Sequence, residues 1–372
     1  MRVIISGGGT GGHLYPGLAI ARGLQRQFPE AEILFVGTPR GLEARVVPEE
    51  GFPFVPVEVK GWTDRRLSWS TLKSGFAFAK GLREAARIIK NFSPRVVIGT
   101  GGYVCVPVVL AACWQGIPAL LHEQNAFPGL ANRFLSRWAD AVMLTFSEAE
   151  RFFPKACRTV HTGLPVRPEI LQRDRRRGAA EWGLDPGKIT VLSMGGSQGA
   201  RSINCAMLEV VEYFCRAPEW QLIHATGPGG YDEFMEALSL RGLKVERSGN
   251  IRIVPYLYRM EHALAAADLA VCRAGASTLA EITACGIPAI LIPYPYAADN
   301  HQAYNARVLE EKGAAVVIPD SSLNGELLLK TVQGLLENKE QLYQMARQSL
   351  RLAKPQALDL ILREVTNVLE RA

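Results

Sequence analysis

The sequence predicts an α/β protein made of two Rossmann-like, doubly wound domains that face a central cleft. Three observations lead to this prediction. The chain has 372 residues, which is enough for two domains. Short apolar segments alternate with helical patterns along its length, which is typical of parallel sheets covered by helices on both faces. The series restarts after a polar, arginine-rich stretch, and each half begins with a strand and a glycine-rich loop.

The apolar segments place a similar set of strands in each half. The first half has expected strands at 2–6, 32–36, 95–99, 118–122, 141–145 and 158–162, and the second at 189–194, 221–226, 251–255, 269–272, 289–292 and 315–318. The expected domains are therefore residues 1–164 and 165–354. Residues 355–372 are expected to return to the first domain as a last helix, because they carry an amphipathic stripe made of Leu358, Ile361, Leu362, Val365, Val368 and Leu369.

The first glycine-rich loop, SGGGTGGH at residues 6–13, predicts an anion site. Gly7, Gly9 and Gly12 fit G-x-G-x-x-G between a strand and a helix, which directs backbone N–H groups towards a phosphate. A dinucleotide site would also need an acid near the end of the second strand, but Glu30 and Glu32 lie before that strand or at its start. No G-K-[ST] follows, so a Walker loop is excluded.

The second half offers two comparable segments. GGSQGAR at 195–201 repeats the strand–loop–helix pattern, and CRAGASTLAEI at 272–282 places Ser277 and Thr278 at an expected helix start with Glu281 one turn later. Hydroxyls and free N–H groups there suit a diphosphate, and Glu281 suits the hydroxyls of a ribose. The alternatives are a tight turn for each loop and a capping box between Thr278 and Glu281.

Composition narrows the class of protein. A hydrophobic content of 48% with 21% charged residues is typical of a globular chain. The net charge of +6 permits anionic partners, but no module typical of nucleic-acid binding is present, so no nucleic acid is expected. Seven cysteines without C-x-x-C spacing indicate reduced thiols, and no secretory signal or Asp-x-Asp metal motif is seen. The uncharged segment 96–121 is broken by glycine and proline, so we expect it in the core.

Taken in order, these motifs resemble the MurG family of bacterial transferases. The resemblance rests on GGGTGGH, GTGGYV (99–104), LLHEQNAFPGLAN (120–132), GLPVR (163–167), GGSQGAR, CRAGASTLAEI and ADNHQAYNA (298–306). It implies a GT-B fold and inverting transfer of N-acetylglucosamine from UDP-N-acetylglucosamine to the 4-hydroxyl of undecaprenyl-linked muramoyl-pentapeptide. This step converts lipid I to lipid II in peptidoglycan synthesis. No cofactor and no metal are implied.

The resemblance also assigns residues to the sugar-nucleotide site. It implies that Thr10, Gly11, Gly12, Asn125, Arg167, Ser197 and Gln302 contact the sugar nucleotide or line its site. The diphosphate and ribose would be held by Ala276, Ser277, Thr278, Leu279, Ala280 and Glu281, and the uracil by backbone near Leu257. The chain departs from the family at Leu164, where asparagine is common, and at His301, where a second glutamine is frequent.

His13 is the candidate catalytic base. An acceptor hydroxyl must lose a proton as it attacks the anomeric carbon, and the ordinary pKa of histidine, about 6.5, suits that task. His13 follows the first glycine loop directly. The alternatives are a purely structural His13, and a competing acid–base pair formed by His122 and Glu123.

A lipid-linked acceptor requires access to a membrane, and the region 62–87 offers a surface for it. Phe78, Leu82, Ala85 and Ile89 form the expected core face of a helix. An opposite face, proposed to contact an anionic bilayer at the cytoplasmic side of the plasma membrane, contains Trp62, Arg65, Arg66, Trp69, Leu72, Phe76, Lys80, Arg83 and Arg87. The alternative is that its aromatic residues pack on a neighbouring loop. The oligomeric state is not predicted.

Two other classes of function were weighed. One is a different GT-B enzyme, such as a diacylglycerol glycosyltransferase or a sugar-nucleotide epimerase. The other is a nucleotide-binding or redox module without transferase activity. The HEQN and GGSQGAR segments favour the N-acetylglucosaminyltransferase, and the expected lipid-facing patch disfavours an epimerase.

Overall fold

The computed structural model of the chain describes residues 1–59, 69–245 and 248–371, with the side chains of 69–77 outside that description. The chain divides into two compact units. Unit 1 comprises Met1–Pro165 and Gln356–Ala372, and unit 2 comprises Val166–Pro355. Each unit contains one parallel sheet. The predicted pair of Rossmann-like sheets is therefore confirmed, and each unit is described by itself below.

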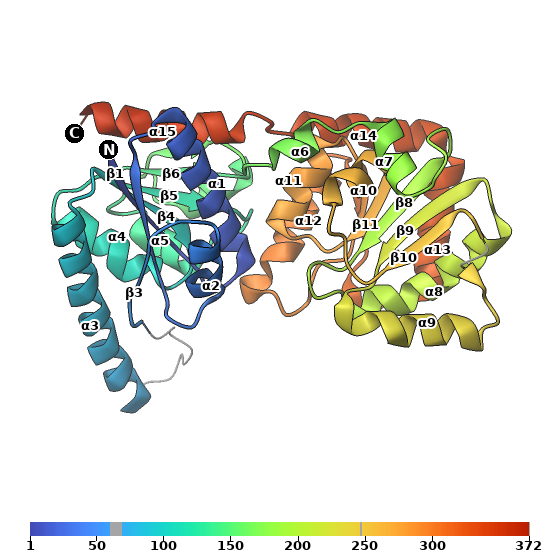
Figure 1. Cartoon of the computed structure of the whole chain (residues 1–372), viewed down its shortest axis with the longest axis horizontal. Helices are drawn as coiled ribbons and strands as arrows, with labels where there is room; N and C mark the ends of the chain where they lie inside the picture. Colours follow the sequence, from blue (N-terminus) through green and yellow to red (C-terminus); the bar gives the residue numbers. More distant parts are fainter. Residues whose placement is uncertain (60–68, 246–247, 372) are drawn as a thin grey trace. The chain divides into compact units, whose positions relative to one another are not determined.

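Unit 1 is built on a seven-stranded parallel sheet in the order β3-β2-β1-β4-β5-β6-β7 (Figure 1). Its strands are β1 (Arg2–Gly7), β2 (Glu32–Gly37), β3 (Phe54–Pro56), β4 (Val96–Gly101), β5 (Ala119–Glu123), β6 (Ala141–Leu144) and β7 (Thr159–His161). Its helices are α1 (Gly11–Gln27), α2 (Leu42–Glu49), α3 (Trp69–Phe92), α4 (Cys105–Trp114), α5 (Leu130–Leu135) and α15 (Ala357–Arg371), with a 3-10 turn at Ser147–Phe152.

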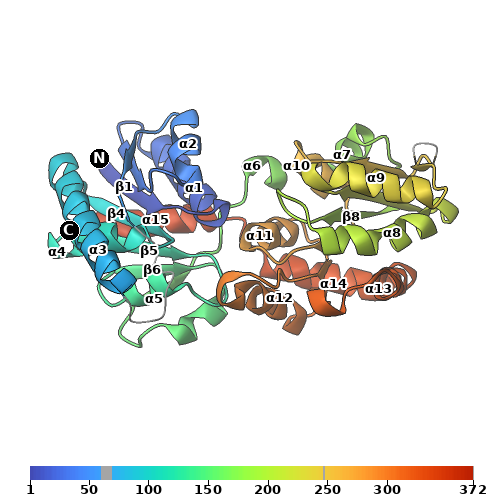
Figure 2. The same ribbon diagram turned by 90° about the horizontal axis from the view of Figure 1, so that it is seen from below.

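The two faces of this sheet bury different helices because successive strand residues point to opposite sides. Val3 and Ile5 of β1 share a core with α1, α2 and α15, whereas Ile4 shares a second core with α3, α4 and α5. Figure 2 shows α3 in front of the strands and α15 behind them. Both faces are thus covered, as the near-continuous apolar strands predict.

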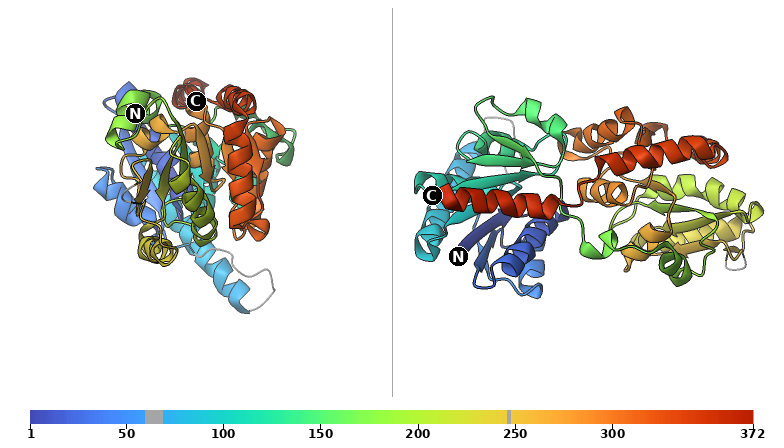
Figure 3. Two further views of the ribbon diagram at one scale, coloured as in Figure 1. Left: turned by 90° about the vertical axis from the view of Figure 1, so that its right-hand side faces the viewer. Right: turned by 90° about the horizontal axis from the view of Figure 1, so that it is seen from above.

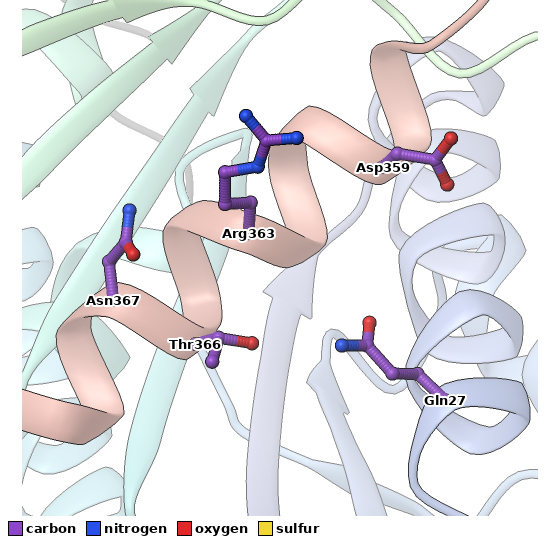
Figure 4. A pocket seen from close by; sticks show the side chains of 5 residues that line it. All are labelled: Gln27, Asp359, Arg363, Thr366 and Asn367. Carbon is purple, nitrogen blue, oxygen red and sulfur yellow. The ribbon is translucent and has the colours of Figure 1, made fainter.

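The helix α15 packs along α1, as Figures 1 and 3 show. Gly23 of α1 permits this approach, because a Cβ at that position would lie 2.9 Å from Cδ1 of Leu358. Arg158, which directly precedes β7, donates a 2.6 Å hydrogen bond to Glu364 of α15 and so connects this helix to the sheet. A shallow hollow beside this seam is lined by exposed or half-exposed polar side chains (Figure 4), namely Gln27, Asp359, Arg363, Thr366 and Asn367.

The predicted core face of α3 is observed in part of the helix. Ala85 and Ile89 are fully buried, and Phe78 and Leu82 are partly buried against the same core, while Lys80 and the arginines at 83 and 87 are exposed. Lys80 forms a 2.7 Å ion pair with Glu58. The remaining residues of the proposed membrane face lie outside the described residues or have side chains outside the description: Trp62, Arg65, Arg66, Trp69, Leu72 and Phe76. Within the described part, none of the helices is both long and apolar enough to cross a bilayer.

Unit 2 repeats the plan with a six-stranded parallel sheet in the order β10-β9-β8-β11-β12-β13. Its strands are β8 (Ile189–Met194), β9 (Trp220–Ala225), β10 (Ile251–Val254), β11 (Leu269–Cys272), β12 (Ala289–Leu291) and β13 (Ala315–Val317). Its helices are α6 (Pro168–Leu171), α7 (Arg175–Glu181), α8 (Arg201–Arg216), α9 (Tyr231–Leu240), α10 (Met260–Ala266), α11 (Ala276–Ala284), α12 (His301–Glu311), α13 (Gly325–Glu337) and α14 (Lys339–Leu352). The main core joins the sheet to α8, α9, α13 and α14.

The expected strands are all present, with ends that differ by one or two residues, but one observed strand was not expected. β3 has only three residues and pairs with β2 at the edge of the first sheet. It ends on Pro56 and follows Pro53, which hid it from the apolar pattern. Proline is tolerated at such an edge because no further strand needs its N–H group.

Buried His224 of β9 makes the stability of unit 2 depend on pH. Burial lowers the pKa of His224 to about 3, and the ring packs against Phe234 with its Nδ1 atom 3.0 Å from Oγ of Ser193. The unfolded chain takes up a proton near pH 6.5, whereas the folded chain stays neutral until the pH is near 3. The free energy of unfolding therefore decreases as the pH falls from about 6.5 to about 3.

We expect His224→Leu to abolish this part of the pH dependence. The free energy of unfolding of the variant, relative to wild type, should rise by about 2 kcal/mol between pH 7 and pH 5, since only the wild-type chain gains a proton on unfolding. Urea titrations of both full-length proteins at the two pH values measure the difference. A difference that does not change with pH would contradict the assignment.

Candidate functional site

In unit 1, the loops after β1 and β4 meet where the strand order reverses. β1 and β4 are neighbours in the sheet, and open α/β sheets bind ligands at such a switch point. Gly102 has a φ of +83°, and a Cβ there would lie 2.6 Å from the carbonyl oxygen of Gly8. Gly101 has a φ of +110°, and its Cβ would lie 2.5 Å from Nδ1 of His13. Only glycine lets these loops, and the imidazole of His13, approach so closely.

The first glycine loop binds an anionic group, and this group is the side-chain carboxylate of Glu43. Glu43 of α2 is buried, and its carboxylate accepts hydrogen bonds from the N–H of Gly9 at 3.0 Å and from the N–H and hydroxyl of Thr38 at 2.9 and 2.7 Å. Burial raises the pKa of Glu43, but the hydrogen bonds from Thr38 and Gly9 outweigh it, so the pKa lies below its usual value. The expectation that this loop binds a phosphate must be corrected at Gly9, because the Glu43 carboxylate already uses that amide.

His13 lies at the start of α1, half-buried, with its Nδ1 atom 3.0 Å from Oε1 of Gln124. Among the residues that the structure describes, no hydrogen bond reaches its Nε2 atom. Thr10 is the exposed N-cap residue of α1, and Gly11 and Gly12 are its first two residues. The helix thus starts with backbone N–H groups that need partners from outside it.

The alternative acid–base pair, His122 and Glu123, is buried in β5. Burial lowers the pKa of His122 to about 4, and its Nε2 atom lies 3.0 Å from the carbonyl oxygen of Gly163. The Glu123 carboxylate accepts hydrogen bonds from the N–H groups of Asn125 and Gly129 and from the amide of Asn132. This burial argues against direct proton transfer from an acceptor to either group. Both side chains instead hold the 124–132 loop.

In unit 2, the loops after β8 and β11 occupy the equivalent switch point. α11 begins at Ala276 with Gly275 as its N-cap, so the N–H groups of Ala276, Ser277 and Thr278 have no partner within the helix. The first intrahelical bond runs from Leu279 to Gly275. A capping box at Thr278 is therefore excluded, because Thr278 lies inside the helix. Such a helix start is suited to bind a diphosphate.

Arg167 and Glu281, which were assigned separately, form one ion pair. Nε and Nη2 of Arg167 lie 3.1 and 3.0 Å from Oε1 of Glu281. Burial raises the pKa of Glu281, while the charge and hydrogen bond of Arg167 act against this rise. The arginine side chain is half exposed and the carboxylate is mostly buried. Glu281 is the sixth residue of α11, so the pair places a guanidinium beside the middle of this helix.

The other predicted residues of unit 2 lie on the loops after β8 and β10 and in the helices α11 and α12. Gln302 accepts hydrogen bonds from the N–H groups of Ala274 and Tyr294 at 3.1 and 2.9 Å, which leaves its amide nitrogen as the group to offer a sugar. Ser197 is exposed on the loop after β8. Leu257 is buried after β10. Within α11, Leu279 is buried and Ala280 is half-buried.

The sequence reasoning missed three residues that hold these loops. Glu43 is the acid of the first turn of α2, and Gln124 follows the titratable pair at the end of β5. Arg273 donates hydrogen bonds to Asp320 and to the hydroxyl of Ser202, and so ties the loop after β11 to the start of α8. Gln124 and Arg273 lie inside the quoted motifs LLHEQN and CRAGAS, which were the available signal, whereas Glu43 lies in none of the quoted motifs. Within the described residues, no group of three or more His, Cys, Asp or Glu side chains could hold a metal ion.

Comparison with known proteins defines the class. Residues 3–144 match the glycosyltransferase family 28 N-terminal domain, and residues 190–361 match the glycosyltransferase family 28 C-terminal domain. The chain is therefore a family 28 glycosyltransferase, consistent with its two sheets and their glycine loops.

Within this class, the chain matches relatives along its whole length. The UDP-N-acetylglucosamine–N-acetylmuramyl-(pentapeptide) pyrophosphoryl-undecaprenol N-acetylglucosamine transferase of Desulforamulus reducens is 53% identical over 100% of both chains. The enzyme of that name from Desulforudis audaxviator is 51% identical over 97% of both. The crystal structure of Acinetobacter baumannii MurG is 30% identical, with a TM-score of 0.78 over 100% of this chain and 99% of the other. The chain belongs to the MurG family, which confirms the resemblance of its motifs.

We expect Gly101→Ala to lower the rate of sugar transfer by at least about tenfold, because its Cβ would displace the imidazole of His13 from its place on the loop. Gly116→Ala is the matched control. It also has a positive φ, of +71°, but nothing lies within 4 Å of its Cβ. Equal transfer rates for the two variants would show that the contact with His13 does not matter.

Proposed function

We propose that this chain transfers N-acetylglucosamine from UDP-N-acetylglucosamine to the 4-hydroxyl of undecaprenyl-pyrophosphoryl-muramoyl-pentapeptide. The reaction converts lipid I to lipid II in peptidoglycan synthesis. The observation that carries this proposal is the 53% identity, over the full length of both chains, to a relative whose name states that activity. The glycine loops at both switch points support it.

His13 is the proposed base. In one displacement, the acceptor hydroxyl gives its proton to Nε2 of His13 while its oxygen forms a bond to the anomeric carbon. The bond from that carbon to the phosphate oxygen breaks, and uridine diphosphate leaves with the electron pair. An α-linked sugar thereby becomes β-linked, so the transfer inverts the configuration. The Nε2 atom, to which none of the described residues forms a hydrogen bond, lies on a half-buried ring, and this supports the role.

Unit 2 is the proposed site of the sugar nucleotide. The N–H groups at the start of α11, at Ala276–Thr278, would hold the diphosphate, and Glu281 would accept hydrogen bonds from the ribose hydroxyls. Gln302 would offer its amide nitrogen to the sugar, and backbone near Leu257 would contact the uracil. Ser197, from the loop after β8, would line the same site.

The leaving group develops negative charge on a phosphate oxygen. The helix start at Ser277 and Thr278 and the guanidinium of Arg167 are suited to stabilise it. One well-aimed hydrogen-bond donor lowers the barrier by about 3–4 kcal/mol. The ion pair with Glu281 holds Arg167 beside α11 before the nucleotide binds.

Unit 1 is the proposed acceptor and membrane unit, and its residues Thr10, Gly11, Gly12 and Asn125 would contact the sugar nucleotide or line its site. Its contact with an anionic bilayer would use the region 62–87, of which Lys80 and the arginines at 83 and 87 are described and exposed. The enzyme would then act as a peripheral protein at the cytoplasmic face of the plasma membrane. The undecaprenyl chain of the acceptor would stay in the bilayer.

We expect His13→Ala and Glu281→Ala to impair different kinetic constants. Loss of a general base should lower kcat by about 100- to 10,000-fold with little change in the KM for UDP-N-acetylglucosamine. Loss of the proposed ribose partner should raise that KM by about tenfold or more. Turnover of radiolabelled UDP-N-acetylglucosamine with a short-chain lipid I analogue measures both constants.

His161→Ala and Glu219→Ala are the matched controls, because they remove an exposed histidine from unit 1 and an exposed glutamate from unit 2. An unchanged kcat for His13→Ala would remove His13 from the mechanism. Sugar transfer to diacylglycerol but not to the lipid I analogue would favour the related glycolipid enzyme instead.

A further inference from the structure

The amide of Gln124 lies between two histidines at the end of β5. Its Oε1 atom is 3.0 Å from Nδ1 of His13, and its Nε2 atom is 3.1 Å from Nδ1 of His122. The Gln124 side chain is 2% exposed, so water cannot replace a missing partner. The direction of this amide therefore controls which hydrogen bond each histidine can make.

Two backbone carbonyl groups fix that direction. Nε2 of Gln124 donates to the carbonyl oxygen of Thr100 at 2.8 Å and to that of His122 at 3.0 Å. Carbonyl oxygens only accept, so turning the amide over would place its own oxygen against both of them and leave buried groups without partners. Oε1 must therefore face His13.

His122 adds a second constraint on the amide. Its Nε2 atom lies 3.0 Å from the carbonyl oxygen of Gly163, which only accepts, so this nitrogen carries the hydrogen. Burial lowers the pKa of His122 to about 4, so the ring is neutral near pH 7 and its Nδ1 atom carries no hydrogen. That bare nitrogen lies 3.1 Å from Nε2 of Gln124, where it shares one N–H group of the amide with the carbonyl oxygen of His122, and this again excludes the turned-over arrangement.

These contacts determine the tautomer of His13. Oε1 of Gln124 has no hydrogen to give, so Nδ1 of His13 must donate to it. A neutral imidazole has only one N–H group, and Nε2 is then left with its lone pair. We propose that Gln124, itself held by Thr100 and His122, is a positioning residue that keeps His13 in the Nδ1–H tautomer and leaves Nε2 ready to take the acceptor's proton.

The arrangement also suits the proton transfer itself. When Nε2 gains a proton, Nδ1–H still donates to the same amide oxygen, so none of the hydrogen bonds around Gln124 has to change. The neighbouring Gly101 keeps room for the ring beside the loop. This inference deepens the proposed role of His13 as base and rests on it, but the tautomer can be measured without any turnover.

The direct test is an NMR spectrum of the full chain labelled with ¹⁵N-histidine, recorded at a pH where His13 is neutral, with its signals assigned by their loss in His13→Ala. The wild type should show a protonated Nδ1 and a bare Nε2 at His13. Gln124→Leu, which removes the acceptor with little change in size, should shift His13 towards the Nε2–H tautomer that free imidazole side chains favour in water. Gln115→Leu, at an exposed glutamine that bonds the carbonyl of Ala86, should leave the spectrum unchanged.

Kinetics provide the second readout. Gln124→Leu should lower kcat by about 10- to 1,000-fold while the KM for UDP-N-acetylglucosamine stays within about twofold of wild type. An Nε2–H tautomer of His13 in the wild-type chain would overturn the proposal even if Gln124→Leu fails to fold. An Nδ1–H tautomer that persists in a folded Gln124→Leu variant would overturn it too. A bare Nε2 in a chain whose His13→Ala variant keeps full activity would instead refute the proposed function and leave the tautomer assignment intact.

Discussion

The close approach of the two loops that follow β1 and β4 is the constraint on which the unit 1 site depends. Gly102 comes against the carbonyl of Gly8, and Gly101 against the ring of His13, so side chains are excluded from both positions. Unit 2 contains a similar close approach at Gly199, where a Cβ would collide with the carbonyl oxygen of Thr226. In both units a strand-end loop can therefore expose main-chain groups that bulkier residues would cover, and in unit 1 the loop also leaves room for the ring of His13.

Buried and half-buried polar side chains hold these loops in place. Glu43 fastens the first loop, Glu123 the loop after β5, Gln124 the ring of His13, and Gln302 the loop after β11. A buried polar group without partners costs free energy, so each of these side chains tolerates few alternative loop positions. The reactive groups are thereby oriented before any substrate binds, which is the property that a displacement at an anomeric carbon requires.

The sequence predicted the strands and the loops well because apolar periodicity and glycine spacing are local signals. It did not predict the contacts that orient His13, since Gln124 is 111 residues away and Glu43 reaches Gly9 across 34 residues. The burial of His122 could have been predicted from the sequence, because His122 lies in an apolar central strand of a parallel sheet, and every residue of this strand is buried. The alternative of a capping box at Thr278 is excluded for a local reason, because it would start the helix at Leu279, three residues after its actual start at Ala276.

We propose that the two units bind different anions: the first glycine loop binds the chain's own Glu43 carboxylate, and the start of α11 binds the diphosphate of the sugar nucleotide. A crystal structure of the full chain with bound UDP-N-acetylglucosamine tests this assignment most directly. The account predicts phosphate oxygens within hydrogen-bonding distance of the N–H groups of Ser277 and Thr278, with the bond between Gly9 and Glu43 intact. A diphosphate bound at Gly9, with Glu43 displaced, would contradict it.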